Sequence, residues 1–103
     1  AFVGNHGMLQ IHSGPIHKVW YAKPWLNVLD DSFNLHLRMD HIDTAWVVKK
    51  PTVDGLVTSF EIFDAQGDAI AMLFGLRKPG QQELSAWRDL LDEIQETQQA
   101  CAA

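Results

Sequence analysis

Apolar and polar residues alternate most regularly between positions 33 and 39. The odd positions are apolar and the even positions polar: Phe33, Leu35, Leu37 and Met39 against Asn34, His36 and Arg38. This period of two predicts a β-strand with its apolar side turned inward. A second strand is expected over 25–29, and the intervening Asp30, Asp31 and Ser32 favour a turn, so we predict a hairpin.

The stretch from 44 to 78 predicts a three-stranded antiparallel meander. In 56–63 the even positions form the more apolar row, and after a turn at 64–67 the even positions of 69–76 continue it: Leu56, Thr58, Phe60 and Ile62, then Ile70, Met72, Phe74 and Leu76. Upstream, a strand through Trp46 and Val48 ends in two lysines, and Pro51 to Gly55 has the residues that stop one strand and start another. Cations therefore fall at the rim of the predicted sheet.

The two ends of the chain complete the predicted architecture. We expect a turn over 4–7, a short strand over 8–12, an irregular segment over 16–24 and a helical turn over 40–43. From about Glu83 a helix is expected, with one apolar stripe on the sheet and its acids in water: Leu84, Trp87, Leu91 and Ile94 against Glu83, Asp89, Asp92, Glu93 and Glu96. The prediction is an α+β fold: a curved antiparallel β-sheet of about six strands, with a C-terminal amphipathic helix packed on one face through Trp87.

Composition fits one globular domain over 1–103. Hydrophobic residues make up 47% of the 103 positions, which is enough for a core. No run approaches the roughly 18 apolar residues of a membrane span, and no signal peptide precedes the first predicted strand, so a cytoplasmic protein is expected. Cys101 is the single cysteine, which excludes an internal disulfide and a thiolate zinc site.

The charge is unevenly distributed. The net charge is −5, and residues 83–103 carry five acids against Arg88, which is −4 of that total. Nucleic acid is an unexpected partner because no basic stripe exists. The clustered cations Lys49, Lys50, Arg77 and Lys78 suit a small anionic ligand better. The spacing of the early histidines does not match the close-set pairs of a zinc site, so no metal ligand is assigned.

Five segments, taken in order, resemble the second half of the HemS/ChuX family of bacterial haem-utilisation proteins. They are Gln10–Pro15, Pro24–Asp30, Phe33–Arg38, Ala45–Val48 with Lys50–Thr52, and Phe63–Asp64. The resemblance covers nearly the whole chain. It implies a cytoplasmic, haem-binding protein of iron acquisition, and this chain is expected to be an incomplete version of one such half.

The resemblance also implies a haem site. Lys50, at the end of the Trp-Val-Val strand, and Arg77, after Phe-x-Gly, are expected to meet the haem propionates. Such a pairing is physically sensible, because carboxylates need charge-assisted donors. Met72 and Phe2 are assigned to the same site; Ala71-Met72 stands where some relatives have a Tyr-Gln pair. The axial histidine of larger members lies upstream of this chain, so no iron ligand and no catalytic residue is assigned.

Three functions remain open from the sequence. The preferred one is a haem-binding and trafficking domain, with a haem oxygenase, a haem importer or a second copy of the chain as candidate partners. The second is a haem-degrading enzyme, which would need an open iron position for O₂ and an electron donor. The third is a packing or dimerisation piece that binds no haem alone.

Overall fold

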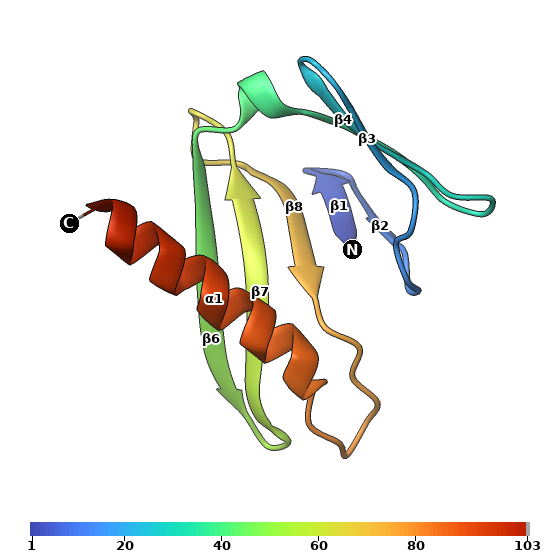
Figure 1. Ribbon diagram of the computed structural model, residues 1–103. Coiled ribbons are helices and arrows are strands. Elements are labelled where there is room, and N and C mark those ends of the chain that lie inside the picture. The colour runs from blue at the N-terminus through green and yellow to red at the C-terminus, as the bar shows by residue number, and fades with distance from the viewer. Residues whose placement is uncertain (103) are drawn as a thin grey trace.

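Two antiparallel sheets and one helix make up the structure, a computed structural model that describes the backbone of residues 1–102 and the side chains of residues 1–97. Figure 1 shows α1 lying across β6 and β7, with the smaller sheet away from the helix. The elements are β1 (Phe2–Asn5), β2 (Met8–Ile11), β3 (Val19–Ala22), β4 (Trp25–Leu29), β5 (Asn34–Arg38), a 3₁₀ turn (Met39–His41), β6 (Thr44–Thr52), β7 (Gly55–Phe63), β8 (Ala69–Phe74) and α1 (Ser85–Ala102). The predicted α+β class is confirmed, with the strands divided between two sheets.

The larger sheet has the strand order β2-β1-β8-β7-β6. Its longest pairing joins β6 to β7 over nine residue pairs, from Thr44 opposite Phe63 to Thr52 opposite Gly55. Gly55 has a φ of 104°, a conformation that side chains with a Cβ rarely adopt, so glycine suits this turn. β6 continues through Pro51, where the sequence prediction had ended it, because β6 is an edge strand and tolerates a missing N–H.

A bulge in β8 decides which residues share a face. Phe63 pairs with Ala69 but Ile62 pairs with Ala71, so Ile70 is an extra residue on its strand. A shift by one residue moves every later side chain to the opposite face. Met72 therefore lies opposite Glu61. The prediction that the even positions of β7 and β8 form one row was wrong for this reason.

The helix packs on the face that carries the even positions of β7. Trp87 donates a hydrogen bond from Nε1 to the Thr58 carbonyl at 2.8 Å, and Lys49 pairs with Asp92 at 3.0 Å. Leu91 is 1% exposed and is the most buried apolar residue of the helix among those up to residue 97, whose side chains the structure describes. The apolar stripe through Trp87 and Leu91 thus docks as predicted.

Two residues before the helix differ from the prediction. The helix begins at Ser85, so Leu84 precedes it and is exposed. Glu83, predicted to face water, is buried and accepts the Thr58 backbone N–H at 2.9 Å and the Arg88 Nε–H at 3.2 Å. A buried carboxylate needs such partners. Glu83 therefore fastens the segment before α1 to the middle of β7.

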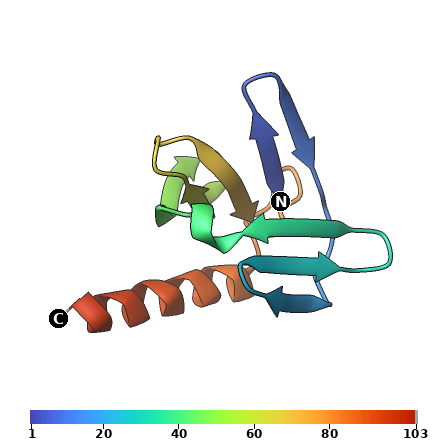
Figure 2. The ribbon, with the colours of Figure 1, turned by 90° about the horizontal axis from the view of Figure 1, so that it is seen from above.

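The smaller sheet has the order β3-β4-β5, and its strands run in a different direction from those of β6 and β7 (Figure 2). The β4–β5 hairpin was predicted; β3 was not, because 16–24 shows no alternation and all of β3 is exposed. Asp30 accepts the backbone N–H groups of His17 and Lys18, at 2.7 Å for Lys18, and this bond lowers the Asp30 pKa. His12 stacks on Phe33 at 3.6 Å and connects the two sheets. Across the described residues, no helix is long and apolar enough to cross a membrane.

Candidate functional site

The face of the larger sheet turned away from α1, called the open face below, carries one continuous row of side chains. Paired residues on neighbouring antiparallel strands share a face, so the register places five residues side by side. From β6 to β2 they are Trp46, Glu61, Met72, Phe2 and Ile11. The row is apolar except for Glu61, the second of its five residues.

A second row lies next to the first and is formed by Val48, Ser59 and Phe74. The Phe2 and Phe74 rings meet edge to face, with centroids 5.0 Å apart and planes at 75°. Such a contact holds both rings in place. Phe2 and Met72, two of the residues predicted for the site, therefore lie together beside a fixed aromatic ring, which the sequence did not single out.

Two polar residues of the open face, Ser59 and Glu61, are more buried than their apolar neighbours. Ser59 is 1% exposed and Glu61 is 7% exposed, whereas Trp46 is 59% exposed. Ser59 donates a hydrogen bond from Oγ to Glu61 Oε2 at 2.6 Å. The alternation in β7 predicted only that the odd positions, which include Ser59 and Glu61, form a mixed face, and it gave no sign of their burial.

The two predicted cations sit toward the same end of the sheet at the backbone level, but their charged groups have different partners. Lys50 lies opposite Val57 on β6, and its Nζ is 3.8 Å from Glu61 Oε2. Arg77 follows β8 and pairs with Asp54, in the β6–β7 turn, at 3.3 Å. Both pairs are partly exposed, so water and other anions can reach them. The assignment of Lys50 and Arg77 to one anion site stays a prediction.

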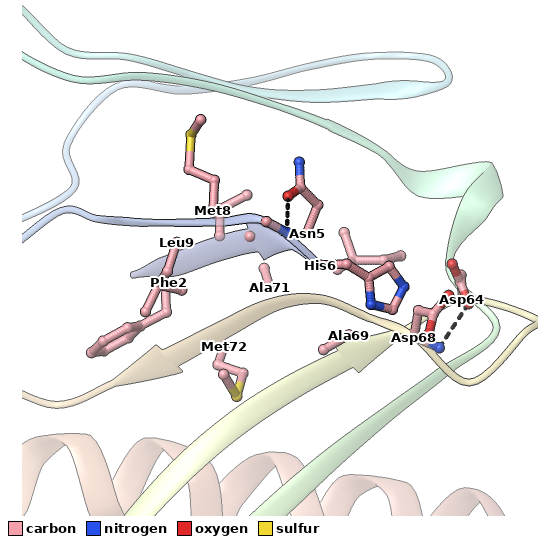
Figure 3. A pocket seen from close by; sticks show the side chains of 14 residues that line it. Phe2, Asn5, His6, Met8, Leu9, Asp64, Asp68, Ala69, Ala71 and Met72 are labelled. Carbon is pink, nitrogen blue, oxygen red and sulfur yellow. Dashed lines mark hydrogen bonds between the residues drawn. The ribbon is translucent and has the colours of Figure 1, made fainter.

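A hollow of about 880 Å³ opens beside the row, where β1 separates from β8 after two residue pairs. Phe2, Met72 and other apolar residues line one part of it. Figure 3 shows His6, in the β1–β2 turn, on the same side of the hollow as Asp64 and Asp68. Within the described part of the chain, no group of three or more metal-ligating side chains gathers here or elsewhere. Phe2 and Met72 belong both to the row and to the lining of the hollow, so the two features adjoin.

Comparison with known proteins gives a consistent result. The family model described as "Haemin-degrading HemS.ChuX domain" matches residues 1–94. The hemin transport protein HemS of Yersinia enterocolitica is 49% identical over 88 residues, which cover 85% of this chain and 26% of that protein. The hemin transport protein HmuS of Yersinia pestis is 47% identical over 93 residues, 90% of this chain and 27% of that protein.

Solved structures agree with the sequence comparison. Holo-PhuS, a heme-binding protein from Pseudomonas aeruginosa, superposes with a TM-score of 0.85 at 50% identity, covering 86% of this chain and 26% of that one. ChuS, described as an Escherichia coli heme oxygenase, gives a TM-score of 0.86 at 47% identity, covering 89% and 28%. The chain spans about a quarter of the length of these relatives.

Proposed function

Because the chain belongs to the haemin-degrading HemS.ChuX domain family, we propose that its open face forms one wall of a haem site in a bacterial haem-uptake and trafficking protein. Haem is a flat apolar macrocycle with two carboxylates on one edge. The observation that carries the proposal is the apolar row through Met72 and Phe2, next to Lys50 on the same face. Similarity to hemin transport proteins and to a heme-binding protein supports it.

The open face supplies binding and orientation. Phe2, Phe74 and Met72 offer a broad apolar surface for the macrocycle, which favours burial of its rings. Lys50 and Arg77 supply charge-assisted donors for the propionates. Membership of the family implies haem as cargo or substrate. Any chemistry at the site would be that of the iron in the bound haem. The residues of this chain would hold and orient the porphyrin ring. A cytoplasmic location and transfer to a haem oxygenase belong to the same proposal.

A haem titration followed at the Soret band tests this proposal. The chain would be compared with a version extended upstream, and we expect a saturable Soret shift in the longer version at least. The Met72→Glu variant is a useful comparison, because a second carboxylate in the row, next to Glu61, should weaken binding of the macrocycle. Absence of a saturable shift in both lengths would refute the proposal.

Haem degradation is the second candidate, favoured by the similarity to a protein described as a heme degrading enzyme. It predicts that haem bound to the longer version, given O₂ and an electron donor, is converted to an open tetrapyrrole with release of iron. Transfer of intact haem to a separate oxygenase, without such a product, would instead favour trafficking.

A further inference from the structure

Glu61 is a nearly buried carboxylate between two apolar residues of the row on the open face. Its side chain is 10% exposed, and its row neighbours across the strands are Trp46 and Met72. A buried carboxylate is costly unless it is hydrogen-bonded and paired with a cation. Ser59 supplies the hydrogen bond, and among residues 1–97 Lys50 is the cation within 4 Å. The arrangement is therefore an ion pair inside the proposed ligand surface.

Lys50 reaches this position by lying lengthwise on the open face. Its backbone is opposite Val57, four residues before Glu61 on β7, which is about 13 Å along the strand. The lysine side chain must extend over Ser59 to bring Nζ within 3.8 Å of the carboxylate. The ammonium is thus drawn inward from the end of the strand, over the surface that a ligand would cover.

We propose that Glu61 is a resident counter-ion of Lys50 that competes with the carboxylate of an incoming porphyrin. The inference rests on the proposed function, because it concerns the same surface. With no ligand bound, Glu61 holds the ammonium; when a porphyrin carboxylate binds Lys50, Glu61 repels it from beneath. Glu61 therefore lowers affinity for carboxylate-bearing porphyrins and eases their release, which suits a protein that passes its cargo on.

Two opposing effects decide whether Glu61 weakens or strengthens porphyrin binding. Glu61 restricts the flexible lysine, which would favour binding by reducing the rotamer entropy lost. Against this, Glu61 repels the porphyrin carboxylate. Two negative charges a few ångströms apart at an effective dielectric of about 20 weaken a binding constant by roughly tenfold or more. Lys50 is 61% exposed, so water screens part of the repulsion. Repulsion still exceeds the ordering benefit, and removing the charge should tighten binding.

The test is a haem titration of parent and Glu61→Gln in the upstream-extended version of the chain. Glutamine keeps the shape and can still accept the Ser59 hydrogen bond. We expect Glu61→Gln to bind haem about threefold to tenfold more tightly at low salt, with the difference shrinking as salt rises. Haem dimethyl ester, which has no free carboxylate, should bind parent and variant equally.

The matched control is Glu96→Gln, which removes the same charge from an exposed position on α1 and should leave Kd unchanged. In a Lys50→Ala background the tightening caused by Glu61→Gln should largely disappear, because the two residues act together. If Glu61→Gln lowers the melting temperature, Glu61→Met removes the charge with an apolar side chain and should also tighten binding.

The outcomes separate the two hypotheses. If the parent binds haem and Glu61→Gln binds no more tightly, the counter-ion role is refuted and the haem site stands. An equal gain for haem and its dimethyl ester would also refute the counter-ion role. If neither parent nor Glu61→Gln binds haem, the proposed function fails, and the inference fails with it.

Discussion

Docking of α1 on the sheet depends on Trp87. The loss in free energy of unfolding caused by Trp87→Ala measures how strongly this residue holds the helix. Deleting a fully buried aromatic costs about 3–5 kcal/mol, but Trp87 is half-buried, so we expect about 2–3 kcal/mol from packing. Loss of the Nε1–H bond to the Thr58 carbonyl adds about 1 kcal/mol. The sum of about 3–4 kcal/mol corresponds to a fall in melting temperature of more than about 10 °C.

Gly75 lies directly under the Trp87 ring and supplies the second half of this test. A Cβ on Gly75 would be 2.5 Å from two ring atoms and 2.8 Å from the Trp87 Cβ. Gly75→Ala should therefore destabilise the parent by about 1–3 kcal/mol through overpacking. In the Trp87→Ala background its cost should be smaller, because the ring atoms are gone and only the Cβ contact remains.

Urea unfolding followed by far-ultraviolet circular dichroism is the measurement, since the chain has four tryptophans whose fluorescence would be hard to assign. Trp87→Phe is the comparison that removes the hydrogen bond while keeping much of the packing. If Trp87→Ala melts within a degree or two of the parent, or if the two substitutions add without coupling, the helix does not dock through this contact.

Three further substitutions test other parts of the structure. Lys50→Ala with Arg77→Ala should weaken haem binding about tenfold to a hundredfold, and should lower the haem-free melting temperature because Glu61 loses its cation. An unchanged Kd would mean that these cations do not contact the ligand. Glu83→Ala should lower the free energy of unfolding in urea by about 2–4 kcal/mol, because the Thr58 N–H and the Arg88 guanidinium lose their acceptor. A change below about 0.5 kcal/mol would contradict the role of the buried Glu83 carboxylate in joining the segment before α1 to β7. Backbone hydrogen bonds lower the Asp30 pKa in the folded state, so the stability that ionised Asp30 contributes is complete above its unfolded pKa and is lost as pH falls below about 4. In Asp30→Asn, the fall of melting temperature with decreasing pH should therefore be shallower than in the parent. An unchanged acid limb would argue against this role of Asp30.

The sequence could not reveal the polar centre of the candidate site. Phe2 and Met72 were assigned from family resemblance, and the register places them in one row. The sequence placed Glu61 only on the mixed face of β7, because alternation shows no more than that it faces away from Ile62. Its burial depends on Met72 and the side chains of adjacent strands, which no local pattern contains.

The sequence by itself determined the α+β class, the β4–β5 and β7–β8 hairpins and the helix stripe through Trp87 and Leu91. These follow from periods of 2 and 3.6 and from turn residues, all of which are local. Only the tertiary structure decided the division into two sheets and the face on which each row lies. One extra residue, Ile70, moves Met72 to the face of Glu61, because pairing register depends on contact between strands and alternation within one strand cannot report it.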